Sequence, residues 1–260
     1  MTRGVKPTQG IRRLLEQDPA QRLLDQLELV QHKAGLATLR RVIRRTTRRV
    51  TAGWIHVTDT QLPCDRLLAA ALLGIPAPRS FIGPRTRRIF DNGTYTHLRF
   101  QSYFHHLPKP FEVEAPKLLR QWPVIGEADI TVRHPELGAW GIELKTINSL
   151  QWRQLTRPQE AHTYQLNCYL GLLGGEWAGQ VWYENKNDQE LKLFTIRRDK
   201  FEWERAWRRA SDVAYQLLAT ERLPRLCGNC PDPAFCEDKI VCTTKLLEEL
   251  DEQRKTSPPR

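Results

Sequence analysis

The chain has 260 residues, 40% of them hydrophobic, which is enough to bury one sizeable core with extensions around it. Forty lysines and arginines stand against thirty acidic residues, and the net charge of +10 favours a polyanionic partner such as nucleic acid. The longest apolar run, 67–75, is far shorter than the roughly 20 residues that cross a bilayer, so we expect no membrane-spanning helix.

Residues 1–50 are expected to form a basic helical extension. Residues 11–15 and 21–49 have the leucine and arginine content of one short and one longer helix, separated by Asp18-Pro19. Paired arginines recur every four residues, which on a helix forms one long basic stripe: Arg40, Arg41, Arg44, Arg45, Arg48 and Arg49. This stripe is either a DNA-binding track, which would add salt-dependent affinity without sequence preference, or a solvated cationic surface.

Residues 85–106 are predicted to form a helix with one inward stripe. Its members share helical spacing: Ile89, Gly93, His97, Phe100 and Phe104. A helix glycine costs roughly 0.5–1 kcal/mol relative to alanine, so Gly93 indicates a close approach to another backbone. His97 lies one turn later on this face, where it is either a satisfied core histidine or a metal ligand.

Two apolar-rich runs, 129–133 and 139–145, are joined by a connection that contains proline and glycine, and this pattern predicts a β-hairpin. Strand side chains alternate between faces, so Glu143 and Lys145 share a face on which Asp129 can meet Glu143. Two converging carboxylates repel each other unless a cation lies between them, and hard oxygen ligands suit Mg²⁺ or Mn²⁺. A lysine beside them can steady an attacking water or the charge on phosphorus. The pattern indicates a metal-dependent nuclease; the alternative is solvated residues on exposed strands.

A second helix is predicted over 158–173, where two glycines follow. His162, Gln165 and Tyr169 lie about one turn apart and share a face of this helix. These residues either contribute to a functional site or are simply partly buried side chains. Two further strands are expected after the helix: 180–185 and 190–196.

The chain has six cysteines: Cys64, Cys168, Cys227, Cys230, Cys236 and Cys242. Three of them form a C-x2-C-x5-C cluster over 227–236, among glycine and prolines, where a loop can wrap around a metal. Thiolates of this kind hold zinc or an iron–sulfur cluster. Cys168 is expected to be a small core residue, and Cys242 either a buried residue or a replacement ligand. Disulfides are not expected in a basic chain without a secretory signal.

Four motifs, taken in order, resemble the RecB-type branch of the PD-(D/E)XK nuclease superfamily. They are Gly-x-x-x-His (Gly93 to His97), Gly-x-x-Asp (Gly126 to Asp129), Glu-x-Lys (Glu143 to Lys145) and Gln-x-x-x-Tyr (Gln165 to Tyr169). The resemblance implies four ligands for a divalent metal: His97, Asp129, Glu143 and the backbone carbonyl of Leu144. It also implies that Lys145 is the catalytic lysine, and that Gln165 and Tyr169 position the DNA strand or this lysine.

The cysteines resemble those of one group within this branch. A single N-terminal cysteine and a C-terminal C-x2-C-x5-C around such a core are similar to the iron–sulfur nucleases, namely the AddB subunit and the CRISPR-associated Cas-four exonucleases. This resemblance implies that four thiolates hold a [4Fe–4S] cluster that joins the two ends of the domain: Cys64, Cys227, Cys230 and Cys236. Zn²⁺ on the same thiolates is the alternative.

The expected fold is therefore α/β, with a central mixed β-sheet flanked by helices, a restriction-endonuclease-like core and a helical iron–sulfur cap. The nuclease domain is expected over 51–250, between the extension 1–50 and a polar tail, 251–260, whose composition is typical of disorder.

The resemblance implies a cytoplasmic DNA exonuclease that acts 5′ to 3′ on single-stranded or frayed ends, in recombination, repair, or CRISPR or phage DNA processing. The sequence contains no G-x-x-x-x-G-K-[S/T] phosphate loop, so a helicase motor would be a separate partner. Two alternatives remain: a non-catalytic DNA-binding or scaffold subunit, and a processing subunit that is active only within a larger recombination or integration complex.

Overall fold

The computed structural model describes residues 53–62, 64–74 and 84–220. The helices are η2 (Val57–Gln61, a 3-10 helix), α3 (Asp65–Leu72), α4 (Pro84–His105), α5 (Ser149–Gln154), α6 (Glu160–Leu173) and α7 (Lys200–Thr220). The strands are β1 (Ile55–His56), β2 (Glu112–Glu114), β3 (Lys117–Gln121), β4 (Val124–Ala128), β5 (Ile130–His134), β6 (Gly138–Ile147), β7 (Ala178–Asn185) and β8 (Leu191–Ile196). Four predictions lie outside the described residues: the N-terminal extension, its arginine stripe, the polar tail, and the cysteines after residue 220.

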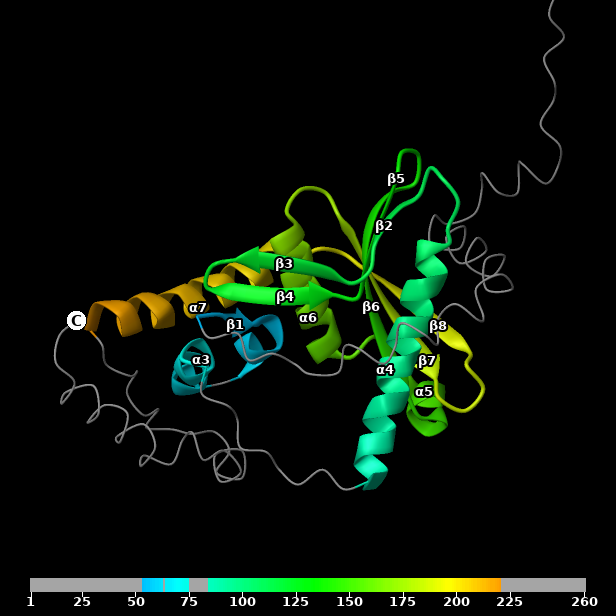
Figure 1. Ribbon diagram of the computed structural model, residues 1–260, viewed down its shortest axis with the longest axis horizontal. Coiled ribbons are helices and arrows are strands. Elements are labelled where there is room, and N and C mark those ends of the chain that lie inside the picture. The colour runs from blue at the N-terminus through cyan, green and yellow to red at the C-terminus, as the bar shows by residue number, and fades with distance from the viewer. Residues whose placement is uncertain (1–52, 63, 75–83, 221–260) are drawn as a thin grey trace, which may run out of the picture.

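The strands form two sheets, and helices cover both faces of the larger one (Figure 1). Its order is β2-β5-β6-β7-β8; β6 and β7 are parallel and the other pairs antiparallel. Phe100 and Phe104 of α4 pack on one face, whereas Leu166 and Leu170 of α6 pack on the other. The smaller sheet has the order β1-β4-β3. These layers confirm the expected mixed sheet flanked by helices.

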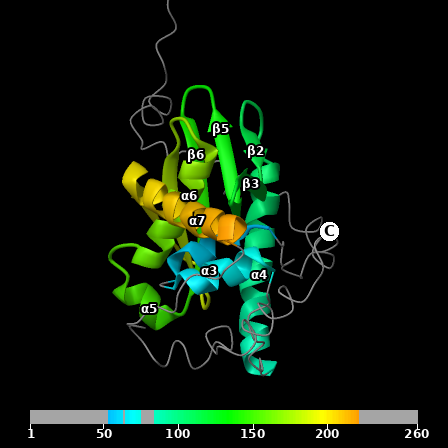
Figure 2. The same ribbon diagram turned by 90° about the vertical axis from the view of Figure 1, so that its left-hand side faces the viewer.

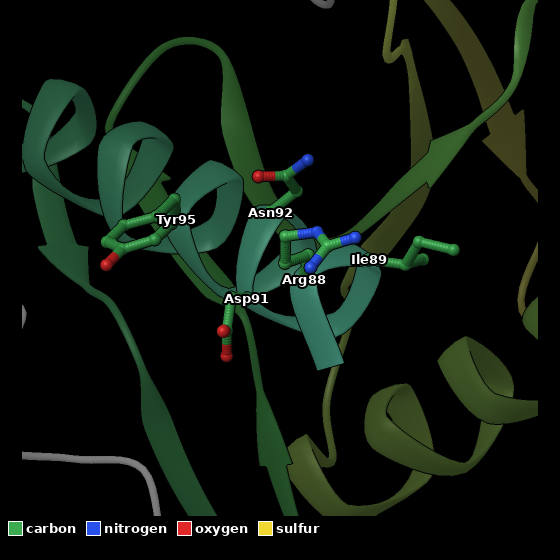
Figure 3. A pocket seen from close by; sticks show the side chains of 5 residues that line it. All are labelled: Arg88, Ile89, Asp91, Asn92 and Tyr95. Carbon is green, nitrogen blue, oxygen red and sulfur yellow. The ribbon is translucent and has the colours of Figure 1, made fainter. Parts of the chain in front are cut away.

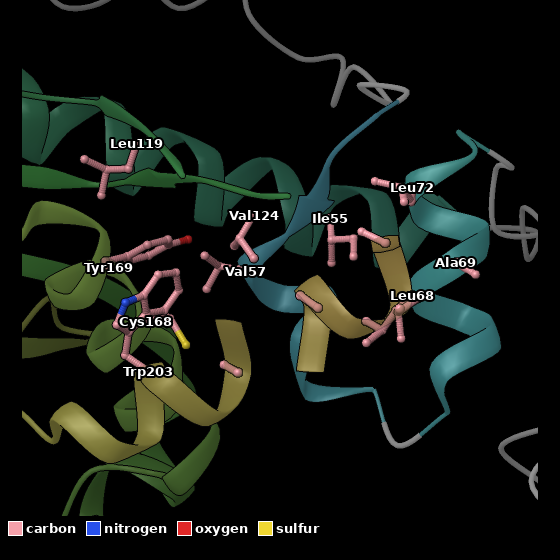
Figure 4. Close-up of a cluster of buried hydrophobic side chains, with 14 of the residues drawn as sticks. Ile55, Val57, Leu68, Ala69, Leu72, Leu119, Val124, Cys168, Tyr169 and Trp203 are labelled. Carbon is pink, nitrogen blue, oxygen red and sulfur yellow. The ribbon is translucent and has the colours of Figure 1, made fainter. Parts of the chain in front are cut away.

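A third layer, which the sequence analysis missed, lies outside α6. Figure 2 shows α7 in front of α6 with α3 beside it, and Figure 4 shows the apolar cluster that these helices share. Trp203 approaches α6 so closely that a Cβ on Gly171 would overlap its indole ring. The signal for α7 was present in the sequence, because its buried residues recur at helical spacing: Trp203, Ala206, Ala210, Val213, Ala214 and Leu217.

The predicted hairpin is confirmed as β5 and β6, with Ile130 paired to Ile142. Asp129 itself belongs to neither strand, because it lies at the bend where the chain leaves β4 in the smaller sheet and enters β5 in the larger one. The predicted strand pair over 180–185 and 190–196 is likewise confirmed as β7 and β8.

The predicted inward stripe of α4 is only partly correct. Phe100 and Phe104 are buried, but Ile89 is 44% exposed because the N-terminal turns of α4 extend past the strands (Figure 1). Among the described residues, a Cβ on Gly93 would meet only Thr146 Oγ1, at 3.8 Å, which is an ordinary contact. The interpretation of Gly93 as the mark of a close backbone approach is therefore wrong.

The second predicted helix is confirmed as α6, which begins at Glu160 and ends where Gly174 adopts a φ of 66°. None of the helices in the described ranges combines the length and the apolar character that spanning a bilayer requires.

Candidate active site

The residues of the sequence motifs meet at one place, although four parts of the chain supply them. They come from α4, the β4–β5 bend, β6 and α6: His97, Asp129, Glu143, Lys145, Gln165 and Tyr169. Two hydrogen-bonded series hold them, one around Asp129 and one around Lys145. Because residues 143 and 144 are adjacent in β6, the two series are joined through the backbone.

Asp129 is held by three contacts. Its Oδ1 lies 2.9 Å from His97 Nδ1, and its Oδ2 accepts the backbone N–H of Leu144 at 2.8 Å. Its backbone oxygen also accepts Gln101 Nε2–H at 3.2 Å. Gln101 was missed by the sequence analysis, although it lies one turn after His97 on α4. These contacts fix the carboxylate at the bend between the two sheets.

Glu143 is the most buried acid of the site, with only 1% of its surface exposed. Its Oε1 pairs with Lys145 Nζ, which also donates to Gln165 Oε1 at 3.1 Å. Gln165 Nε2 in turn donates to Tyr169 Oη at 2.9 Å. Glu143 Oε2, however, is buried and has no hydrogen-bond partner among the described residues. A buried carboxylate oxygen without a partner is costly, so a further positive group is expected to face it.

The glycine of the Gly-x-x-Asp motif has a steric role. A Cβ on Gly126 would lie 2.6 Å from Tyr169 Cε1 and 2.8 Å from Val57 Cγ2. The side chain of Tyr169 therefore rests directly on β4, and only glycine leaves room for it. This contact sets the position of Tyr169, which then orients Gln165 and, through it, Lys145.

The acids of the site have oppositely shifted pKa values. Burial, followed by the charge of Asp129, raises the pKa of Glu143 to about 7, although Lys145 opposes this rise. Burial also acts to raise the pKa of Asp129, but the charges of His97 and Lys145 outweigh it and lower that pKa. A second negative charge beside Asp129 is therefore unfavourable unless a cation compensates it.

Both basic residues of the site have raised pKa values. Burial acts to lower the pKa of His97, but Asp129 and Glu143 outweigh burial and raise it. The pKa of Lys145 is raised in the same way, since its pairing with Glu143 and the charge of Asp129 exceed the effect of burial. Lys145 is thus a firmly charged ammonium group inside the site.

The donor set fits a hard divalent cation, because the charge of Asp129 acts on Glu143 and Glu143 Oε2 lacks a partner in the described ranges. The other contacts are made between protein side chains: His97 contacts Asp129 Oδ1, and Lys145 contacts Glu143 Oε1. Accordingly, no group of three or more His, Cys, Asp or Glu side chains within the described part of the chain is arranged to hold an ion as it stands. The roles of His97 and of the Leu144 carbonyl as ligands stay predictions.

The described cysteines occupy different settings. Cys64 precedes the first turn of α3 and is 4% exposed. Cys168 is completely buried in the core between α6 and α7, as predicted. Cys227, Cys230 and Cys236 lie outside the described residues, so the cluster stays a prediction.

A pocket on α4 is separate from the site. It is lined by side chains of the N-terminal half of that helix: Arg88, Ile89, Asp91, Asn92 and Tyr95 (Figure 3). At about 100° per residue, Arg88 and Tyr95 project from the side of α4 opposite to His97. The pocket therefore contributes nothing to the chemistry around Asp129.

Comparisons with models of protein families and with curated protein sequences find no match for this chain. Among solved structures, the crystal structure of SSO0001 is similar over 76% of this chain and 88% of that one, at 20% identity and a TM-score of 0.39. An alkaline exonuclease from Laribacter hongkongensis is similar over 65% of this chain and 89% of that one, at 15% identity and a TM-score of 0.45. The same exonuclease in complex with dAMP gives the same coverage and identity, and a TM-score of 0.46. At these levels the similarity assigns no activity to this chain.

Proposed function

We propose that this protein is a metal-dependent deoxyribonuclease of the PD-(D/E)XK type that hydrolyses DNA phosphodiesters. The observation that carries the proposal is Glu143: a fully buried carboxylate with one oxygen on Lys145 and the other without a partner in the described ranges, next to Asp129. Two acids and a charged lysine at this spacing suit the cleavage of a polyanion better than they suit structural stability, since buried charges are costly. The basic composition supports the choice of nucleic acid.

In this proposal Asp129, Glu143, His97 and the Leu144 carbonyl hold Mg²⁺ or Mn²⁺. Such a cation lowers the pKa of a bound water and neutralises charge on the phosphate when it is bound. Lys145, held between Glu143 and Gln165, keeps its ammonium group beside the reacting phosphate, where it orients the nucleophile or stabilises a phosphate oxygen. Gln165 keeps the lysine in place and is itself held by Tyr169.

The finer assignment follows the family resemblance: an exonuclease that acts 5′ to 3′ on single-stranded or frayed ends. The arginine stripe, Arg40 to Arg49, is proposed as a track for the DNA backbone. Helicase, recombination or integration proteins are the proposed partners. None of these points depends on the geometry around Asp129, so each can fail without affecting the nuclease proposal.

Product analysis tests the activity directly. Protein purified without oxygen is incubated with end-labelled single- and double-stranded DNA, with Mn²⁺, Mg²⁺ or a chelator. We expect progressive shortening from the 5′ end with Mn²⁺ or Mg²⁺ and none with the chelator, because the two carboxylates require a cation. Internal cuts would indicate an endonuclease instead. Intact DNA under every condition would contradict the nuclease proposal and favour a scaffold role.

We also propose that Cys64, Cys227, Cys230 and Cys236 hold a [4Fe–4S] cluster. The packing of α3 on α7 supports this arrangement, because Cys64 precedes α3 and the other three cysteines follow α7 in the sequence. Arg209 of α7 pairs with Asp65 at 2.7 Å and donates to the Leu62 carbonyl at 2.6 Å, which ties the segment around Cys64 to α7.

Cys230→Ser is expected to remove the brown colour and the bound iron of protein purified without oxygen, since a [4Fe–4S] cluster needs its thiolate ligands. The measurements are the visible absorption spectrum and the iron content per chain. Cys168→Ala is the matched control, because Cys168 lies in the apolar core and should leave both unchanged. If the wild-type protein were colourless and contained one zinc per chain, the four cysteines would hold zinc and not an iron–sulfur cluster.

A further inference from the structure

One histidine next to the proposed site has no role in the mechanism above. His162 lies in the first turns of α6, three residues before Gln165, and is half-buried. Its Nδ1 lies 2.8 Å from Tyr183 Oη, and the centroids of the His162 and Tyr183 rings are 5.6 Å apart. Tyr183 belongs to β7 and is paired in register with Lys145 of β6, so both side chains project from the same face of the sheet. His162 therefore lies on the Lys145 side of the site.

The surroundings of Tyr183 determine where its hydroxyl hydrogen points. The side chain is completely buried, and Oη accepts the backbone N–H of Gln159 at 3.0 Å. A backbone N–H can only donate, so the buried hydroxyl needs a separate acceptor for its own hydrogen. The other polar atom that contacts it in the described structure is His162 Nδ1. The Tyr183 O–H therefore donates to Nδ1.

This hydrogen bond selects the tautomer of His162. A neutral imidazole has one hydrogen, and when Nδ1 is an acceptor that hydrogen is on Nε2. Burial, and then the charge of Lys145, lowers the pKa of His162 to about 4, so the ring is neutral near pH 7. Within the described ranges Nε2 makes no hydrogen bond, and it is not one of the buried side-chain atoms that lack a partner, so solvent can reach it. His162 thus presents a fixed, uncharged N–H donor.

The ligand that this donor suits is an anion. His162, Gln165 and Tyr169 follow one another along one face of α6, with Lys145 bound to Gln165 in the middle. The ammonium group of Lys145 attracts anionic groups to this face, and the Nε2–H can only donate. A phosphate oxygen accepts such a bond irrespective of the base it carries.

We propose that His162 donates its Nε2–H to a non-bridging oxygen of the DNA phosphate next to the scissile one, on the Lys145 side. The inference rests on the proposed nuclease function, and it assigns His162 as a substrate-binding residue with Tyr183 as its positioning residue. The donor is neutral, so it can orient the strand without adding a second cation beside Lys145.

Two variants of His162 distinguish the effect of the Nε2–H donor from the effect of changing the packing of the side chain. In His162→Asn the amide oxygen can replace Nδ1 as the acceptor for Tyr183, but nothing reaches the position of Nε2. In His162→Gln the amide nitrogen reaches that position and keeps a donor. With Mn²⁺ we expect His162→Asn to lower kcat/KM about tenfold, chiefly through KM, and His162→Gln to stay within about threefold of wild type. Equal losses in both variants would overturn the proposal.

A modified substrate locates the contact. A single methylphosphonate is placed at the linkage next to the scissile one, which replaces one non-bridging oxygen with a methyl group and removes the negative charge that strengthens the bond. This change should slow wild-type cleavage about tenfold and slow His162→Asn much less, because that variant has already lost the interaction. An equal effect on both proteins would contradict the contact. Wild-type protein that does not cleave the unmodified DNA would instead overturn the nuclease proposal itself.

The tautomer can be tested without activity. Nitrogen-15 NMR of labelled histidine should show a protonated Nε2 and an unprotonated Nδ1 for His162, with the signal assigned by its absence from His162→Gln. In Tyr183→Phe the hydroxyl is lost, and Nδ1 should become partly protonated. Wild-type protein with the hydrogen on Nδ1 would refute the inference.

Discussion

Asp129→Asn is expected to reduce Mn²⁺-dependent DNA cleavage by about 10³-fold while DNA binding stays close to that of wild type. Asparagine has nearly the same shape and keeps an oxygen that can accept the Leu144 N–H, so the bend between β4 and β5 should survive. It lacks the negative charge, and a metal centre supplies several kcal/mol of transition-state stabilisation, where each 1.36 kcal/mol is a factor of ten in rate. Single-turnover cleavage measures the loss, and fluorescence anisotropy with labelled DNA in the presence of Ca²⁺ measures binding.

The matched control for Asp129 is Glu127→Gln. Glu127 is an exposed acid two residues earlier, on β4, and its replacement removes the same charge from the same region. We expect this variant to cleave DNA at the wild-type rate. If Asp129→Asn kept full activity, or if both variants lost it to the same extent, the assignment of Asp129 as a metal ligand would be wrong.

The second large effect is expected on stability. Arg99 of α4 forms an ion pair with Glu184 of β7, whose side chain is only 6% exposed. Thr96 Oγ1 donates to the same carboxylate at 3.3 Å, and Arg99 also donates to Gln189 Oε1 at 2.9 Å. These contacts join α4 to the end of β7 and thereby hold the helix that carries His97.

Arg99→Met should lower the free energy of unfolding by about 3 kcal/mol, because it leaves the carboxylate of Glu184 buried without its counter-charge. Denaturation with urea measures the change. The exposed pair Arg208 with Glu204, at 3.7 Å, provides the control, and Arg208→Met should cost less than about 1 kcal/mol. Adding Glu184→Gln to Arg99→Met should recover part of the loss, since the unpaired charge is then removed. Equal costs for the two arginine variants would show that the Arg99 pair does not anchor α4.

The rate of DNA cleavage by Arg99→Met tests whether the ion pair also positions His97. If the pair positions His97, the variant should lose activity at temperatures at which it is still folded, because α4 is then free to shift relative to Asp129. Wild-type cleavage by the folded variant would separate the stability of α4 from the geometry of the site.

Local patterns in the sequence were sufficient for the elements that carry the site. The hairpin of β5 and β6 follows from two apolar runs and a turn, and the period of two places Glu143 and Lys145 on one face. The spacing of four residues likewise places Gln165 and Tyr169 on one side of α6, where they are hydrogen-bonded. Short-range periodicity controls these relations, so no knowledge of the distant chain was needed.

Long-range contacts were beyond such patterns. The interpretation of Gly93 was wrong because the sequence could not show that α4 and β6 leave room for an ordinary side-chain contact at this position. The steric role of Gly126 likewise became clear only from the position of Tyr169. Two other contacts join residues that are far apart in the sequence: Arg99 with Glu184, and His162 with Tyr183. No helix or strand spacing connects the partners.

The sequence by itself determined the hairpin, the two main helices, and which acids and lysine could share a face, because these depend on helix and strand periodicity. Only the tertiary structure decided that Glu143 Oε2 is buried without a partner in the described ranges, and that Tyr183 holds His162 in one tautomer. Burial and hydrogen-bond direction depend on how α6 packs on β6 and β7, and that packing joins residues whose separation in the chain carries no periodic signal.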